Sequence, residues 1–208
     1  MLLGYFLPGE PLAKTRRPLL LQVSRFDRFK DPLGVVKAFR LVRPHLPVQL
    51  ALAGGTADDD PEGAAVLEDV MEVVGDDPDV HVLALPPDAH RTINALQRRA
   101  DLVLQKSVRE GFGLTVTEAM WKGKPVIGGA AGGIVMQLQD YNTGFLVHSP
   151  EGCAFRIRYL LHRPEIARRL GQKAREFVRQ HFLITRDIRE YLTLMILCEN
   201  PGQRVIEF

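Results

Sequence analysis

The chain has 208 residues, of which 46% are hydrophobic and 25% are charged, and its formal net charge at pH 7 is +2. These are ordinary values for a globular protein with a sizeable core, as one large domain or two small ones. The near-neutral balance, with both signs interspersed, argues against a nucleic-acid-binding scaffold, whose basic residues would cluster on one face.

The cysteines and the apolar segments indicate in which cellular compartment the protein is expected. Cys153 and Cys198 lie far apart and match no metal-ligand spacing, which favours two thiols in a reducing cytoplasm. The apolar start, residues 1–7, lacks a basic region and is too short for a signal peptide. No segment approaches the roughly 20 apolar residues that span a bilayer. We therefore expect a soluble, cytoplasmic protein that binds neither membrane nor nucleic acid.

Short apolar runs alternate with helical patterns along the chain. We predict strands at residues 19–23, 48–53, 80–85, 101–105, 125–127 and 144–147. Helices are predicted from about residue 32, at 61–74, within 93–99, near 115–121, and through most of the remaining chain to about 195. Continuous apolar strands that alternate with helices indicate a parallel sheet buried on both faces. The predicted fold class is α/β, a single Rossmann-like, doubly wound sheet with a helical C-terminal tail.

Ligands of such sheets bind outside the carboxyl ends of the strands. The loop after the first strand places Arg25, Arg28 and Lys30 within six residues, just before a helix N-terminus. Arginine forks onto phosphate oxygens, lysine supplies a compact charge, and the helix dipole adds to both. A diphosphate clamp is one interpretation of this loop. The other is a surface loop whose cations pair with Asp27 and Asp31.

The loop after the fourth strand carries Glu110 and Glu118, with Gly-Phe-Gly-Leu-Thr-Val-Thr between them. The two glycines let the backbone approach a ligand, and the helix that follows offers unpaired N–H groups to an anion. Glu110 is placed to accept hydrogen bonds from sugar hydroxyls, and Glu118, about one turn inside the helix, from a second polyol such as ribose. This favours a nucleoside diphosphate hexose over a bare phosphate. The alternative makes Glu110 a helix cap and Glu118 a surface residue.

Other nucleotide-binding patterns are incomplete or absent. The sequence Gly111-x-Gly113 lacks the third glycine of a dinucleotide-binding fingerprint and follows the fourth strand instead of the first. There is no phosphate-loop motif, no metal-ligand spacing and no Ser-His-Asp arrangement, so an oxidoreductase, a nucleotidase and a metal site are not predicted. The glycine-rich segment 128–133 is compatible with close approach to a ligand and equally with a flexible connection.

These residues resemble the signature of retaining glycosyltransferases of the two-domain GT-B fold (glycosyl transferases group 1). The resemblance rests on Glu110 and Glu118, spaced as E-x7-E around the glycines, and on Arg25 and Lys30, five apart after the first strand. It covers roughly residues 19–195. The stretches 24–32, 104–125, 143–147 and 182–192 are more similar still to the C-terminal domain of trehalose synthases of the glycosyltransferring type.

The resemblance implies a nucleoside diphosphate glucose as the donor and no metal or other cofactor. Arg25 and Lys30 would bind the diphosphate and stabilise the leaving group. Glu110 would hold the glucose hydroxyls. The other donor-binding positions that it implies are Gly111, Phe112, Gly113, Leu114, Thr115 and Glu118, the last of these on the ribose. Two positions depart from many relatives, which have proline where Val135 stands and glutamate where Gln137 stands.

The trehalose-synthase likeness implies transfer to glucose with retention of configuration, by same-face attack in which the departing phosphate accepts the proton. We expect a nucleotide-sugar-binding domain at 19–195, an extension or interdomain remnant at 1–18 and a tail at 196–208. The N-terminal domain that carries the acceptor pocket in this family is expected to be absent. Donor binding with little transfer is therefore expected, unless that domain, a partner chain or a second copy completes the site. The alternative is a non-catalytic nucleotide-sugar-binding module that acts with a partner chain; uridine, adenosine and guanosine all remain open as the base.

Overall fold

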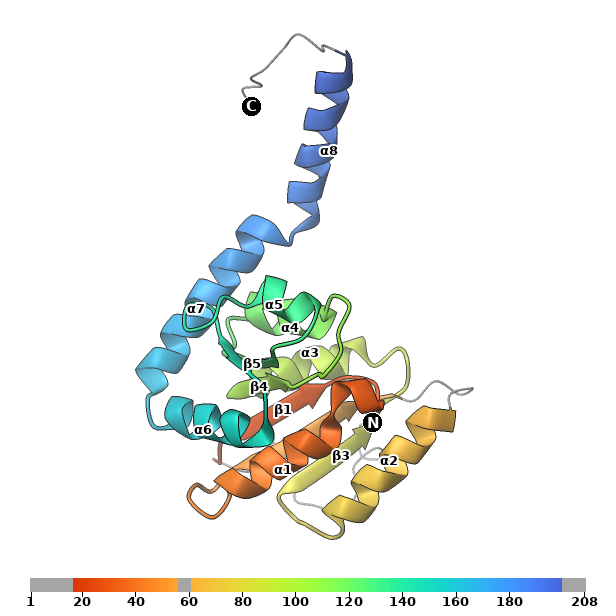
Figure 1. Ribbon diagram of the computed structural model, residues 1–208, viewed down its shortest axis with the longest axis vertical. Helices are drawn as coiled ribbons and strands as arrows, with labels where there is room; N and C mark the ends of the chain where they lie inside the picture. Colours follow the sequence, from red (N-terminus) through yellow and green to blue (C-terminus); the bar gives the residue numbers. More distant parts are fainter. Residues whose placement is uncertain (1–16, 56–60, 200–208) are drawn as a thin grey trace.

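The computed structural model describes residues 17–55 and 61–199, and its centre is one parallel β-sheet (Figure 1). In that part of the chain the strands are β1 (Leu19–Val23), β2 (Gln49–Gly54), β3 (Val80–Ala84), β4 (Leu102–Gln105), β5 (Val126–Gly129) and β6 (Phe145–Val147). They form a six-stranded sheet in the order β3-β2-β1-β4-β5-β6, with every neighbouring pair parallel. The chain adds β2 and β3 on one side of β1 and then β4, β5 and β6 on the other side, as in doubly wound dinucleotide-binding folds.

Helices connect the strands and cover both faces of the sheet (Figure 1). A short 3₁₀ turn, η2, spans Arg28–Lys30. The α-helices are α1 (Pro32–Val42), α2 (Pro61–Val74), α3 (His90–Arg99), α4 (Leu114–Trp121), α5 (Gly133–Gln137), α6 (Pro150–Leu161), α7 (Pro164–His181) and α8 (Ile184–Glu199).

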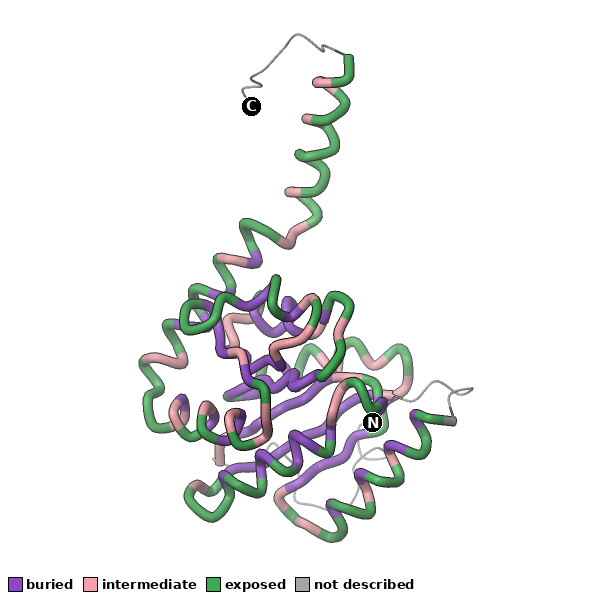
Figure 2. The backbone as a smooth tube through the Cα atoms, viewed as in Figure 1, coloured by how far each residue is buried: buried purple, intermediate pink, exposed green. Residues whose placement is uncertain are grey.

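The core consists of two apolar layers, one on each side of the sheet. Buried residues of α1, α2 and α6 form one layer with alternate strand residues, and buried residues of α3, α4 and α5 form the other. Helix α7 joins both layers, since Leu170 belongs to the first, and Ala174 and Val178 belong to the second. The strands are therefore buried on both faces (Figure 2), which is why their sequences are continuous apolar runs without alternation.

The predicted fold class is confirmed, with small differences in the boundaries. The predicted strands at 48–53 and 125–127 begin one residue later, at Gln49 and Val126. Gly128 and Gly129, assigned from the sequence to a loop, belong to β5, and the short helix α5 was not predicted. Most of the expected N-terminal extension lies outside the described residues. No described helix combines the length and apolar character needed to cross a membrane.

The last helix, α8, projects from the rest of the molecule (Figures 1 and 2). None of its residues is buried. It runs to Glu199, beyond the predicted boundary between domain and tail at 195. Its large apolar side chains are exposed: Ile184, Ile188, Tyr191, Leu192, Leu194 and Met195.

Candidate functional site

The reversal of strand order brings the two predicted ligand loops together. β1 and β4 are neighbours in the sheet and pair through Leu20 with Leu102 and Leu21 with Val103. The chain leaves β1 toward one edge of the sheet and leaves β4 toward the other, which opens a crevice at the carboxyl ends of these strands. The loop that follows β1 and the loop that follows β4 border this crevice.

Two aspartates and a buried lysine fix the shape of the loop after β1. Asp27 Oδ1 accepts a hydrogen bond from the Lys30 N–H at 3.0 Å, at the start of η2. Asp31, at φ 50°, caps α1 by accepting from the Gly34 N–H at 3.0 Å. Lys106, which follows β4 directly and is only 5% exposed, forms an ion pair with Asp31. Lys30 is thus held between two anchored aspartates.

Lys30 and Glu110, both predicted site residues, are in direct contact. Lys30 Nζ lies 2.6 Å from Glu110 Oε2, and the two side chains are 18% and 8% exposed. Ser107 donates a second hydrogen bond to the same oxygen at 3.2 Å. The Val108 N–H donates to the Phe29 carbonyl at 2.8 Å, which joins the two loops through their backbones. A cation and a carboxylate therefore lie side by side where the loops after β1 and β4 meet.

Arg25 lies apart from this pair. Its guanidinium is 3.2 Å from the Asp27 carboxylate, and its side chain is 65% exposed. It lines a neighbouring cleft of about 390 Å³ together with Gly54, Leu85 and Thr115. The sequence predicts that Arg25 and Lys30 form one diphosphate clamp. In the structure Arg25 contacts Asp27 and lines this cleft, and Lys30 contacts Glu110.

The glycine-rich loops after β4 and β5 are packed backbone to backbone. The Gly133 N–H donates to the Glu110 carbonyl at 3.1 Å. A Cβ atom on Gly132 would overlap the Glu110 carbonyl, and one on Gly133 would overlap the Gly111 carbonyl. Segment 128–133 is therefore not a flexible connection: its glycines allow it to support the loop that carries Glu110, and Gly129, Ala130 and Ala131 line a small cavity of about 180 Å³.

Gln137 holds the same loop from α5. Its Nε2 donates to the Phe112 carbonyl at 2.5 Å and is 3.3 Å from the Gly113 carbonyl, and the residue is completely buried. A glutamate carboxylate at this position would have no proton to donate to either carbonyl. Gln137, where many relatives have glutamate, therefore makes hydrogen bonds that an ionised glutamate could not donate.

Helix α4 begins in the crevice with an open N-terminus. Gly113, at φ 53°, occupies the N-cap position and provides no side-chain cap. Leu114 is 67% exposed, and Thr115 Oγ1 donates to Gln105 at the end of β4 at 3.1 Å. The first-turn N–H groups of such a helix attract an anion. The predicted site residues Gly111, Phe112, Gly113 and Leu114 thus lie at and just before the start of α4.

Glu118 lies one turn further along α4, beside a second cleft. This cleft has a volume of about 320 Å³ and is lined by Thr115, Glu118, Lys122 and residues of α3. It shares Val23, Ile93 and Thr115 with the cleft beside Arg25, so the two clefts are adjacent. Burial lowers the pKa of Lys122, partly offset by the nearby Glu118. The polar positions extend from Lys30 and Glu110 to Glu118 along one edge of the sheet.

Three polar contributors to this region are not marked by the sequence as site residues: Lys106, Ser107 and Gln97. Lys106 and Ser107 follow β4 directly, and Gln97 is a buried glutamine on α3. For Gln137 the sequence marks a departure from many relatives but not the contacts that the residue makes. Their roles depend on contacts between elements that are distant in the chain. In the described part of the chain, no group of three or more His, Cys, Asp or Glu side chains is arranged to hold a metal ion.

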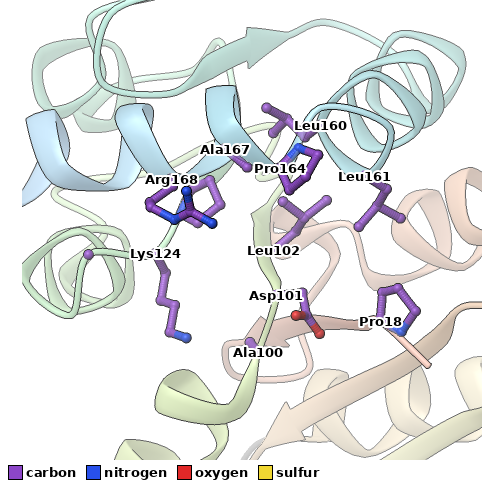
Figure 3. Close-up of a pocket in the computed structure, with 12 residues that line it drawn as sticks. Pro18, Ala100, Asp101, Leu102, Lys124, Leu160, Leu161, Pro164, Ala167 and Arg168 are labelled. Atoms are coloured by element: carbon purple, nitrogen blue, oxygen red, sulfur yellow. The ribbon is translucent and has the colours of Figure 1, made fainter. Parts of the chain in front are cut away.

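A further pocket lies at the amino ends of the strands, on the side of the sheet opposite the candidate site (Figure 3). Pro18, Asp101 and Lys124, which line it, immediately precede or lie near the starts of β1, β4 and β5. It contains none of the predicted site residues. In a parallel sheet the amino ends of the strands are remote from the carboxyl-end crevice where ligands bind. The candidate site is therefore the crevice.

Comparison with known proteins identifies the family of the chain. Residues 7–177 match the family described as glycosyl transferases group 1. The chain is 48% identical over 181 residues to trehalose synthase of Pyrococcus horikoshii, which covers 86% of this chain and 44% of that protein. It spans less than half the length of the curated relatives of this kind.

The fold has counterparts among solved structures. Sucrose-phosphate synthase of Thermosynechococcus elongatus superimposes with a TM-score of 0.74 and 28% identity, over 90% of this chain and 47% of that chain. The C-terminal domain of a glycosyl transferase group 1 family protein, LpcC from Francisella tularensis, gives a TM-score of 0.67 at 22% identity, over 81% of this chain and 87% of that domain. The chain thus belongs to the glycosyl transferases group 1 family and has the fold of a GT-B C-terminal domain.

Proposed function

We propose that the crevice binds a nucleoside diphosphate glucose and forms the donor half of a retaining glycosyltransferase. The observation that carries the proposal is the Lys30–Glu110 contact of 2.6 Å beside the open N-terminus of α4. A cation and a helix N-terminus suit a diphosphate, and an adjacent carboxylate suits sugar hydroxyls. An ammonium has three donors, so the contact with Glu110 leaves others for phosphate oxygens.

The remaining predicted residues extend this donor site. Arg25, which is exposed in the loop after β1, adds its charge to the diphosphate side. Glu118 takes the ribose hydroxyls in the cleft between α3 and α4. The backbone of residues 111–115 contributes N–H groups. The two adjacent clefts beside Thr115 leave room for the base, whose identity the proposal leaves open.

The proposed reaction is of the trehalose-synthase type. Trehalose synthases that are 45% and 48% identical to this chain support it. In this reaction the bond between C1 of the donor glucose and the phosphate oxygen breaks. A bond forms on the same face between C1 and the anomeric hydroxyl oxygen of an acceptor glucose, and the hydroxyl proton passes to the departing phosphate. The positive charge of Lys30 stabilises the leaving nucleoside diphosphate.

The chain spans 44% of the length of that relative, so the acceptor site is proposed to lie on another domain. Closure of two domains excludes water and completes the site. The chain by itself would then bind the donor and transfer little. A nucleotide-sugar-binding subunit completed by a separate partner chain is the second candidate, favoured by the exposed apolar side chains of α8.

Calorimetric titration with uridine, adenosine and guanosine diphosphate glucose tests the donor site. We expect saturable binding of one of them, weakened at least tenfold by Glu118→Ala. Absence of binding to a folded chain, or equal binding by the variant, would contradict the proposed site. Mixing the chain with the N-terminal half of a homologous trehalose synthase, donor and glucose then tests the reaction: formation of trehalose supports it, and donor binding without any product favours the non-catalytic module.

A further inference from the structure

Gln97 is a buried glutamine on α3 that contacts the carboxylate of Glu118 on α4. Its exposed fraction is 0%, and its Nε2 lies 3.0 Å from Glu118 Oε2. Its Oε1 accepts a hydrogen bond from Lys122 Nζ at 2.7 Å. The three side chains therefore form a chain of hydrogen bonds, Lys122 to Gln97 to Glu118, along the wall of the cleft between the two helices.

The chemistry of the two end groups fixes the orientation of the amide. An ammonium only donates and an ionised carboxylate only accepts. Gln97 satisfies both with its NH₂ toward Glu118 and its carbonyl toward Lys122, and rotation of the amide by half a turn would oppose donor to donor and acceptor to acceptor. A glutamate or an aliphatic residue at this position would lose this two-sided match.

The arrangement leaves the other Glu118 oxygen available to the cleft. Over residues 17–55 and 61–199, Oε2 accepts from Gln97, while Oε1 has no hydrogen-bond partner. Glu118 itself is exposed, so without Gln97 its flexible side chain would sample several rotamers. A carboxylate held in one orientation loses less conformational entropy when it accepts a pair of vicinal hydroxyls.

We propose that Gln97, held by Lys122, positions Glu118 to accept the ribose diol and so determines the preference for ribonucleotide over 2′-deoxyribonucleotide donors. The inference rests on the proposed donor function, and it assigns to that site a positioning residue on a different helix. Gln97 does not line the diphosphate end of the crevice. Its effect is therefore confined to the ribose, which separates it from a general contribution to stability.

The experiment measures the dissociation constants of uridine, adenosine and guanosine diphosphate and of their 2′-deoxy forms. For the base that binds best, the ratio of the 2′-deoxy to the ribo constant is compared between the wild type and Gln97→Leu. A hydrogen bond to a charged group predicts a wild-type ratio of roughly ten- to a hundredfold. We expect the ratio to fall below about threefold in the variant, because Glu118 is no longer held toward the diol.

Three further variants make the readout specific. Gln49→Leu removes an equally buried glutamine, 1% exposed and paired with His81, at the amino end of β2, and it should keep the wild-type ratio. Lys122→Met removes the hydrogen-bond donor to Gln97 Oε1 at a partly exposed position, so it tests the chain of hydrogen bonds even if Gln97→Leu fails to fold. It should lower the ratio to an intermediate value. Lys122→Arg, which retains the donor, should restore most of the ratio.

The outcomes separate the inference from the donor function on which it rests. If the wild type discriminates and Gln97→Leu, shown by circular dichroism to be folded, discriminates equally, the positioning role is wrong and the donor site stands. The same holds if Gln97→Leu does not fold and Lys122→Met keeps the wild-type ratio. A wild type that binds nucleoside diphosphates without regard to the 2′-hydroxyl also overturns the inference alone. If the wild type binds none of the six nucleotides, the donor function is overturned and the inference with it.

Discussion

Lys106 is the most deeply buried ionised side chain of the site region. It is 5% exposed and pairs with Asp31, the residue that caps α1 and follows Lys30 in the chain. An ion pair this far from water contributes through the penalty of leaving one partner alone, more than through its net attraction. The pair therefore acts as a fixed point beneath the loop that presents Lys30.

Replacement of Lys106 by methionine removes the charge and keeps most of the side-chain volume. Because Asp31 retains some contact with water, we expect a loss of about 2 kcal/mol in the free energy of unfolding, below the full value for a buried pair. Urea unfolding measures it. Lys37→Met breaks an exposed pair with Glu151 and should change the midpoint little. Equal effects of the two variants would show that the buried pair has no special role.

Glu110 and Lys30 are predicted to act on different parts of one ligand. Glu110→Gln should weaken binding of the nucleoside diphosphate glucose by about tenfold, through loss of a charged acceptor for the sugar hydroxyls, and leave the nucleoside diphosphate much less affected. Lys30→Met should weaken both ligands, since the diphosphate is common to them. Isothermal titration with each ligand checks this. A loss from Glu110→Gln that is equal for both ligands would contradict the assignment of Glu110 to the sugar.

At the scale of elements, the site depends on two loops that pack without side chains between them. Gly133→Ala forces a Cβ into the Gly111 carbonyl, and the overlap is with backbone, which cannot rotate away. We expect a loss of about 1–3 kcal/mol in stability and weaker donor binding, because the loop that carries Glu110 must shift. Thermal unfolding and titration measure the two effects.

A matched alanine substitution lies in the first turn of α6. A Cβ at Gly152 would meet only ordinary contacts, the nearest at 3.6 Å from Ser149 Oγ. Gly152→Ala should therefore stabilise the protein by up to about 1 kcal/mol, since alanine is the better helix former. If Gly133→Ala and Gly152→Ala destabilise the protein equally, the idea that Gly133 is needed for the backbone packing of the two loops is wrong.

The same elements explain what the sequence alone could predict. Each buried strand is a local apolar run, so the fold can be predicted from one short segment of sequence at a time. The candidate residues can be predicted in the same way, because each lies a short distance after the end of a strand: Arg25, Lys30, Glu110 and Glu118. Gln97 beside Glu118, and Gln137 beside the Phe112 carbonyl, require two helices or a helix and a loop to pack together. Contacts of that kind leave no periodic or spacing signal in the chain.

At the scale of the whole molecule, the folded unit and the projecting helix differ in how they are stabilised. Phe182 packs edge-on against Phe112 and Phe177, with ring centroids 5.7 Å apart in each case. Leu183 also packs against the second core layer. From Ile184 onward no residue of α8 is buried. In the described part of the chain the apolar packing of the core therefore ends at Leu183.

A chain that ends at Leu183 should accordingly be as stable as the full chain. Burial supplies most folding free energy, and α8 contributes so little buried apolar surface that we expect a change below about 1 kcal/mol in urea unfolding. Val178→Ala, one turn before the end of α7 and 3% exposed, should by contrast cost about 2 kcal/mol. Donor affinity should also be unchanged in the shortened chain, because the candidate site residues all precede position 123. A large loss of stability on truncation would mean that α8 packs back onto the domain in solution, and a loss of donor affinity alone would place part of the donor site on α8.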